Sequence, residues 1–122
     1  MLRDSFYSIV SQEALNDTSS LTKVSINATH PVFEGHFPEQ PVVPGVCMLQ
    51  MVKDIVSDKV QRVVQLQSIG NVKFTSVVIP QQHPELDITI KYESSDDHSI
   101  KISSTISADE TVFLKISSAV YI

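Results

Sequence analysis

Residues 30–56 decide the fold of this chain and read HPVFEGHFPEQPVVPGVCMLQMVKDIV. Four of the chain's six prolines fall in the first half of this stretch. Because proline lacks a backbone N–H and restricts φ, the half from His30 to Pro44 predicts an ordered, non-helical loop. The second half is apolar at helical spacing, at Val46, Leu49, Val52, Ile55 and Val56. A helix that is apolar nearly all round is predicted to be buried.

The chain around this helix reads as strands. Residues 86–92, 100–106 and 112–122 alternate apolar and polar side chains with a period of two, which is typical of a half-buried antiparallel sheet. Their apolar positions are Leu86, Ile88, Ile90, Tyr92, Ile100, Ile102, Ile106, Val112, Leu114, Ile116, Val120 and Ile122. Polar turn segments at 94–98 and 107–110 suit hairpins. Further strands are expected at 72–78 and in a pair formed by 6–10 and 21–28. The pattern predicts an α+β fold with one buried helix and about six antiparallel strands.

Length and composition restrict the class of protein. A chain of 122 residues is expected to form one domain over residues 1–122. A net charge of -5 disfavours nucleic-acid binding. No apolar run approaches the ~20 residues of a membrane span, and the first ten residues do not read as a secretory signal. Cys47 is the single cysteine, so no internal disulfide can form, and a cytoplasmic location is expected.

The stretch also carries chemistry. Gly35 allows the backbone to bend or to approach a ligand closely just before His36, whose imidazole has an ordinary pKa near neutral pH. Gly45 and Val46 open the predicted helix, where free N–H groups and the positive end of the helix dipole can polarise a carbonyl oxygen. A base and an oxyanion-type donor are therefore predicted near the mouth of an apolar element.

Residues 30–46 resemble the signature of the beta-hydroxyacyl-acyl carrier protein dehydratases, His-Pro-Phe-Phe-x-Gly-His-Phe-Pro followed by Pro-x-Met-Pro-Gly-Val. A looser resemblance spans nearly the whole chain and includes Lys73–Pro80. The resemblance implies the hotdog fold, in which a curved antiparallel sheet wraps around one helix. It also implies dehydration of a 3-hydroxyacyl thioester held on an acyl carrier protein, with no metal or organic cofactor. In this family two subunits build each site together.

Roles for individual residues follow from the same resemblance. His36 matches the histidine that removes the α proton, and Gly45 matches the glycine whose backbone N–H binds the thioester carbonyl. The other matched positions are expected to line the substrate site. They are Phe33, Gly35, Phe37, Pro44 and Val46.

The chain departs from the family on the helix. The catalytic Glu or Asp stands four residues after the Val of Pro-Gly-Val, and here that position holds Gln50. Gln has the right shape but no proton to exchange, and losing a general acid costs roughly 10²–10⁴-fold in rate. Asp54 stands where the family usually has Gln, on the same helix face as Gln50. The pair looks exchanged. Gln50 has either a structural or a substrate-facing role, and Asp54 is expected to be solvated, with a catalytic role as the alternative.

Other side chains receive plainer interpretations. His30 is expected to brace the loop, His83 and His98 to be solvated, and Cys47 to act as a small core residue. Four basic residues are ordinary surface groups that can also meet an acidic carrier protein. These are Lys53, Lys59, Arg62 and Lys73.

Three functions remain open at this point. The first is a carrier-protein-dependent dehydratase of fatty acid or polyene-type acyl synthesis, which uses Asp54 or shares its site with a Glu-bearing homologue in a homodimer or heterodimer. The second is a thioesterase, because the hotdog fold hosts both reactions. The third is a non-catalytic subunit that binds acyl chains or stabilises a partner. The Gly35-His36-Phe37-Pro38 motif favours the dehydratase, whereas Gln50 favours the non-catalytic subunit.

Overall fold

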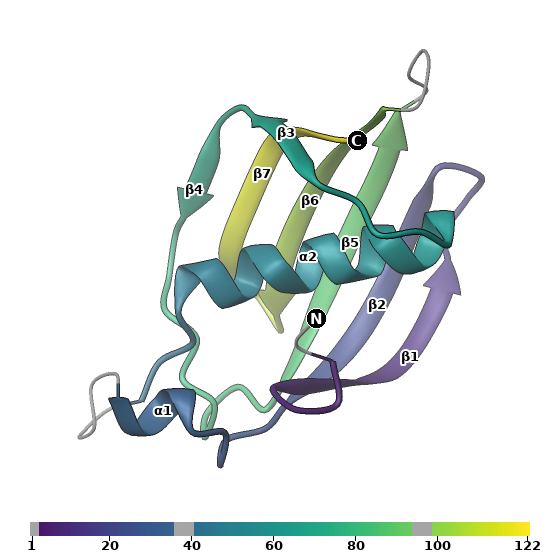
Figure 1. The fold of residues 1–122 in the computed structure, drawn as a ribbon. Helices are drawn as coiled ribbons and strands as arrows, with labels where there is room; N and C mark the ends of the chain where they lie inside the picture. Colours follow the sequence, from purple (N-terminus) through teal and green to yellow (C-terminus); the bar gives the residue numbers. More distant parts are fainter. Residues whose placement is uncertain (1–2, 36–40, 94–98) are drawn as a thin grey trace.

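The computed structural model describes residues 3–35, with the backbone alone at 34 and 35, and residues 41–93 and 99–122. Two helices and seven strands follow one another along these residues (Figure 1). The helices are α1 (Val32–Gly35) and α2 (Gly45–Val60). The strands are β1 (Tyr7–Ala14), β2 (Ser19–Ile26), β3 (Leu66–Ile69), β4 (Val72–Phe74), β5 (Glu85–Glu93), β6 (Ile100–Ala108) and β7 (Thr111–Tyr121).

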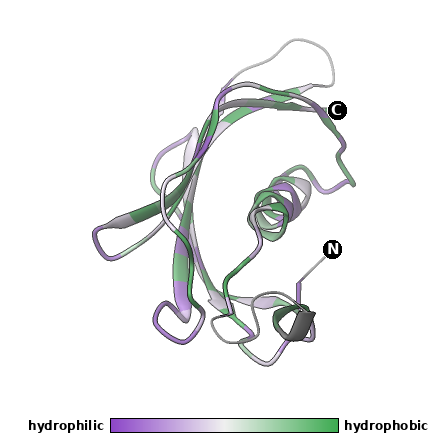
Figure 2. Ribbon diagram, turned by 90° about the vertical axis from the view of Figure 1, so that its left-hand side faces the viewer, coloured by the Kyte–Doolittle hydropathy of each residue, from purple (hydrophilic) through white to green (hydrophobic). Residues whose placement is uncertain are grey.

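The strands form one sheet in the order β1-β2-β5-β6-β7-β3, with β4 also paired to β7. Every pairing between these strands is antiparallel. Figure 2, which looks along α2, shows the sheet curving around that helix. The predicted α+β arrangement of one long helix in a curved antiparallel sheet is confirmed. The strand count is seven because residues 66–69 add a strand that alternation had not revealed, and the strand expected over 72–78 ends at Phe74.

The core lies between the concave face of the sheet and one side of α2. Met51, Val52 and Ile55 of the helix are buried, as are Leu86 and Ile88 of β5. Each fully buried side chain of this size contributes about 1.5–3 kcal/mol relative to an exposed one. The opposite side of the helix is open, since Val46 is 74% exposed. Burial of α2 is therefore one-sided, rather than the enclosure that its apolar composition indicated.

The ends of α2 follow from local sequence. Pro44 precedes the first helical residue with φ -62°, in extended conformation, and provides no side-chain cap. At the other end Gln61 adopts a left-handed conformation and donates its backbone N–H to the carbonyl oxygens of Asp58 and Ser57, which stops the helix. Within the described ranges, neither helix is long and apolar enough to cross a membrane.

Strand β7 departs from strict alternation. Leu114 and Ile116 are buried as expected, but Ala119 and Tyr121 are buried instead of Val120 and Ile122. The pairing with β6 explains the change, because it shifts between Ile102/Ser104 and again between Ile106/Ser107. Each shift adds one residue to β7, and one extra residue moves every later side chain to the other face. The alternation predicted for the end of this strand is wrong for that reason, and it is also wrong at its start, where Val112 is exposed and Phe113 is buried.

The loop predicted over residues 30–44 contains a short helix, so its description as wholly non-helical is wrong. Helix α1 begins at Val32, directly after Pro31, a position where proline is tolerated. Its Phe33 is buried and lies with its ring centroid 5.6 Å from that of Phe6. His30 braces this turn, as expected, because its Nδ1 accepts a hydrogen bond from the N–H of Val32 at 3.0 Å.

Candidate functional site

The site is built around the first turn of α2. The first N–H groups of an α-helix have no acceptor within the helix, and Pro44 supplies no side-chain acceptor. Gly45 is the first residue of that turn, so its N–H lies at the positive end of a helix of 16 residues. A Cβ atom at Gly45 would lie 2.9 Å from Cε1 and Cζ of Phe74. The glycine therefore allows the Phe74 ring of β4 to lie directly against the helix start.

One turn along α2, Gln50 borders a pocket of about 280 Å³ on the open side of the helix. Val46, Leu49, Gln50 and Lys53 of α2, Leu66 and Ile69 of β3 and Tyr121 of β7 line it. Its surface is mostly apolar, and Gln50, Lys53 and Tyr121 are the lining residues with polar groups in their side chains. The helix thus presents the side-chain amide of Gln50 to this pocket.

Asp54 is buried, with 1% of its surface exposed, so the expectation of a solvated carboxylate is wrong. The hydroxyl of Tyr7 donates to its Oδ2 at 3.0 Å, and Nε2 of Gln50 donates to its Oδ1 at 2.8 Å. Tyr7 lies 47 residues earlier, at the start of β1. The curvature of the sheet brings this strand against the helix and covers the carboxylate. The predicted proximity of Gln50 and Asp54 on one helix face is confirmed.

Polar contacts continue past Asp54 toward the end of the helix. Burial, with the negative charge of Asp54 as a further cause, raises the pKa of Tyr7. The phenol therefore stays protonated and remains a hydrogen-bond donor at neutral pH. Arg3 forms an ion pair with Asp58, one turn beyond Asp54. Tyr7 and Arg3 carry no motif, so sequence patterns did not identify them as neighbours of the site.

The structure brings together part of the predicted site. Gly45, Val46 and Gln50 share the N-terminal half of α2, whereas Phe33 is buried in the core against Phe6. Gly35 ends α1. His36, the predicted base, and Phe37 lie outside the described residues, and so does His98. Phe74 was missed as a neighbour of Gly45, although it belongs to the matched segment Lys73–Pro80.

Two side chains away from the helix start were also interpreted from sequence. His83 is not solvated as expected: its ring packs edge-on against Phe113 at 4.9 Å, and its Nδ1 is buried. The cause is the β7 bulge that turns Phe113 inward. Cys47 is half-buried against the core, and burial raises the pKa of its thiol. This environment fits a small packing residue better than a nucleophile.

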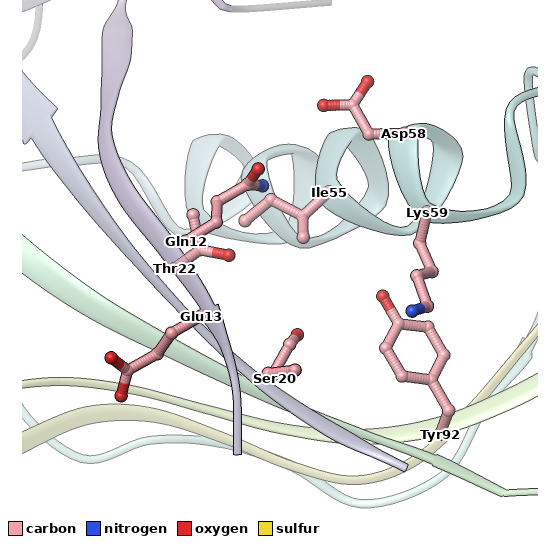
Figure 3. A pocket seen from close by; sticks show the side chains of 9 residues that line it. Gln12, Glu13, Ser20, Thr22, Ile55, Asp58, Lys59 and Tyr92 are labelled. Carbon is pink, nitrogen blue, oxygen red and sulfur yellow. The ribbon is translucent and has the colours of Figure 1, made fainter. Parts of the chain in front are cut away.

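A second pocket, of about 240 Å³, lies at the other end of α2 (Figure 3). Tyr92 and Ser20 of the sheet face Lys59 of the helix there, with Lys59 Nζ 6.0 Å from the centre of the Tyr92 ring. None of the predicted site residues that the structure describes lines this pocket. Among the side chains that the structure describes, no three His, Cys, Asp or Glu gather closely enough to hold a metal ion.

Comparison with known proteins identifies the family. The model of the ApeI-like family, described as ApeI dehydratase, matches residues 11–115. A 3-hydroxyacyl-[acyl-carrier-protein] dehydratase FabZ from Rickettsia bellii is 31% identical over 105 residues, which cover 78% of this chain and 70% of that protein. FabZ from Allorhizobium ampelinum is 29% identical over 80 residues, which cover 60% of this chain and 52% of that protein. The chain spans about half the length of the FabZ from Allorhizobium ampelinum, and about half the length of a second FabZ, from Sinorhizobium fredii.

Solved structures share the fold at lower identity. The dehydratase heterocomplex ApeI:P from Xenorhabdus doucetiae matches with a TM-score of 0.66 and 19% identity, over 93% of this chain and 95% of that one. A mutant thioesterase from Pseudomonas aeruginosa matches with a TM-score of 0.59 and 10% identity, over 92% of this chain and 80% of that one. The hotdog fold expected from the motif is confirmed, since a dehydratase and a thioesterase both share this architecture. By the match of its family model, the chain is a member of the ApeI-like dehydratase family.

Proposed function

We propose that this protein takes part in the dehydration of 3-hydroxyacyl thioesters carried on an acyl carrier protein, as the histidine-donating subunit of a dimer. The observation that carries the proposal is Gln50. The chain keeps the Gly35–Pro38 and Pro44–Val46 motifs of a dehydratase, yet it has an amide where the acid belongs. A chain that had simply lost its activity would have no reason to keep both motifs intact beside one exchanged residue.

The reaction needs three groups. His36 accepts the α proton, and the N–H of Gly45 binds the thioester carbonyl oxygen as negative charge develops on it. A carboxylic acid protonates the departing 3-hydroxyl, so that one C–H bond and one C–O bond break, a C=C bond forms and water leaves. In this family the acid comes from the other subunit. A partner with Glu at the position of Gln50 would complete the site that contains His36 of this chain.

The open side of α2 is the face that we assign to the partner subunit. Leu66 and Ile69 of β3 are 45% and 37% exposed, and β3 lies at one edge of the sheet. An unpaired strand edge next to exposed apolar side chains favours pairing with a second sheet. The same face includes Val46 and Gln50, so the partner would cover the pocket that Gln50 borders. The likeness in fold to the dehydratase heterocomplex ApeI:P supports a dimer of two different chains.

An acidic carrier protein would approach the same end of the molecule. Lys53 lines the Gln50 pocket, and the exposed Lys73 precedes Phe74 on β4, next to the helix start. Lys59 and Arg62 lie at the far end of α2 and contribute less to this surface. Lysines at a site mouth steer an acidic partner mainly by raising its association rate. A cytoplasmic location, where acyl carrier proteins are loaded, is part of this proposal.

The deciding experiment is co-expression with a homologue that has Glu at the position of Gln50. The two chains should co-purify and convert 3-hydroxyacyl carrier protein into the enoyl form, which absorbs in the ultraviolet. His36→Ala in this chain should abolish turnover at the shared site, while His98→Ala should leave it unchanged. Equal turnover in both variants would remove His36 from the mechanism.

Two other results would redirect the assignment. Release of free thiol from an acyl thioester, without loss of water, would identify a thioesterase. Acyl binding without either reaction, in the homodimer and in the mixed dimer, would identify a non-catalytic subunit. Light scattering at micromolar concentration tests assembly separately, since a stable monomer contradicts a site built from two chains.

A further inference from the structure

The amide of Gln50 has a definite orientation. A carboxylate offers only hydrogen-bond acceptors, so the atom of Gln50 that lies 2.8 Å from Asp54 Oδ1 must be the NH₂ group. Rotating the amide by 180° would set two acceptor oxygens against each other and leave a buried carboxylate short of a donor, which is costly. The carbonyl oxygen Oε1 is therefore the end of the amide that is left for the pocket.

The orientation of the Gln50 amide is fixed by hydrogen bonds on the side of the residue that faces the core. Asp54 is 1% exposed, and the Tyr7 hydroxyl donates to its other oxygen at 3.0 Å. Burial raises the pKa of Tyr7 and keeps the phenol a donor. Tyr7 belongs to β1, whereas Asp54 and Gln50 belong to α2. The hydrogen bonds from Tyr7 to Asp54 and from Gln50 to Asp54 therefore connect the amide to the sheet. Two hydrogen bonds across the core thus reach a side chain that borders the pocket.

We propose that Asp54, held by Tyr7, is a positioning residue that makes Gln50 offer only a hydrogen-bond acceptor to the 3-position of an acyl ligand. This inference rests on the proposed function, because it takes the pocket beside Gln50 as part of an acyl thioester site. A 3-hydroxyl can donate to Oε1, whereas a 3-oxo group has no hydrogen to donate. The pocket then selects 3-hydroxyacyl groups over 3-oxoacyl groups even though Gln50 cannot supply a proton.

The other polar groups at the pocket do not make this distinction. The ammonium of Lys53 and the hydroxyl of Tyr121 can donate to a ketone and to a hydroxyl alike. Leu49, Leu66 and Ile69 contact either ligand through apolar atoms. Selection between the two oxidation levels therefore depends on which end of the Gln50 amide faces the ligand, and Asp54 determines that end.

The test measures binding of two unreactive probes, 3-hydroxyoctanoyl-pantetheine amide and 3-oxooctanoyl-pantetheine amide. An amide in place of the thioester makes the α proton too weakly acidic for elimination. The intact protein, in its solution assembly, should bind the hydroxy probe about 10- to 100-fold more tightly, as expected when a bound ligand covers the Gln50 acceptor without pairing it. Gln50→Leu should bring this ratio close to one.

Asp54→Asn is the informative variant. With Tyr7 donating to Asn Oδ1, the Asn NH₂ group faces Gln50 and attracts its Oε1, so the Gln50 NH₂ group turns to the pocket. The preference for the hydroxy probe should fall by about tenfold or reverse. The matched control is Asp58→Asn on the next turn of α2, where an exposed carboxylate pairs with Arg3. It should leave the ratio unchanged.

A folding defect in Asp54→Asn does not end the test. The pair Asp54→Leu with Tyr7→Phe replaces both buried partners by apolar side chains, an exchange that proteins tolerate well. It releases the amide, and the ratio should fall toward one. Equal loss of affinity for both probes in these variants would show a merely structural Asp54 and overturn the inference, with the proposed function intact. Failure of the unaltered protein to bind either probe would also overturn the inference, whereas the proposed function is overturned only if the mixed dimer fails to turn over 3-hydroxyacyl carrier protein.

Discussion

Gln50 donates its side-chain amide to the carboxylate of Asp54 at 2.8 Å, so the two helix positions whose residues are interpreted from the sequence as exchanged are in direct contact. The contact explains why the exchange involves both positions. A carboxylate at position 50 would be repelled by the buried Asp54, whereas an amide at position 50 satisfies it. The carboxylate of Asp54 lies one turn further along the helix than Gln50 and has 1% of its surface exposed.

Gln50→Glu alone should make stability strongly pH-dependent. Two carboxylates within hydrogen-bond distance cannot both ionise, so the pair is expected to hold one proton with a raised pKa. The unfolded chain releases that proton near its ordinary pKa of about 4.3, so the unfolding free energy falls as pH rises above that value. Melting temperatures at pH 5 and pH 8 measure the effect. The unaltered protein is the control, and an equal difference from it at both pH values would contradict the prediction.

Exchanging both residues should restore activity to the homodimer. In Gln50→Glu with Asp54→Gln, the amide moves to the buried position and can still accept from Tyr7 and donate to the new glutamate. A positioned general acid contributes roughly 10²–10⁴-fold. Turnover of 3-hydroxyacyl carrier protein should rise by that factor in the double variant, and Asp54→Gln alone should show no gain. An inert, folded double variant would favour a non-catalytic role.

Tyr7→Phe should destabilise the protein by about 1–3 kcal/mol, because it removes a donor from a buried carboxylate. The matched control is Tyr92→Phe. The Tyr92 hydroxyl is buried and has no hydrogen-bond partner among the residues that the structure describes, so its removal should cost less than about 0.5 kcal/mol. Urea unfolding of the two variants compares them directly. Similar losses of unfolding free energy in the two variants would mean that the hydrogen bond from Tyr7 to Asp54 adds nothing to stability.

Gly45→Ala should displace the Phe74 ring. The new Cβ would lie 2.9 Å from two ring carbons, but the ring is 50% exposed and can swing away, so the cost is expected to stay at about 1 kcal/mol. The cost should largely disappear in a Phe74→Ala background. Unfolding free energies of the two single variants and the double variant give this coupling. Additive losses would show that the glycine is required for another reason.

The tyrosines of the folded protein should lose their protons only at a higher pH than those of the unfolded chain. Burial raises the pKa of Tyr92 and of Tyr121 to about 12, and that of Tyr7 is raised further. These are the chain's three tyrosines, so phenolate absorbance reports on the whole set. It should stay flat through about pH 10, where the urea-unfolded chain titrates. The folded state then retains protons that the unfolded state has lost, so stability should fall as pH rises above 10. Coincident titration curves would contradict this burial.

Local sequence was sufficient for much of the architecture. Prolines at 41 and 44 and the apolar spacing after them predicted the start of α2, and period-two alternation predicted β5, β6 and the burial of Leu114 and Ile116 in β7. These signals depend on residues a few positions apart, so any chain with this pattern tends to form these elements. The motif in residues 30–46 likewise pointed to the dehydratases, because its spacing of Gly, His, Pro and Gly is unusual. The short strand β3 lacked enough residues to show a period.

Tertiary structure decided the rest. Asp54 reads as a polar residue on the hydrophilic end of a helix, and only the curvature of the sheet brings Tyr7 over it from 47 residues away. The bulges in β7 turn Phe113 and Ala119 inward because the pairing with β6 requires extra residues there. The sequence by itself determined most of the elements and set Gln50 and Asp54 one turn apart on α2. The packing of β1 on α2 determined which end of the Gln50 amide faces the pocket, since a buried carboxylate must find its donors wherever the fold places them.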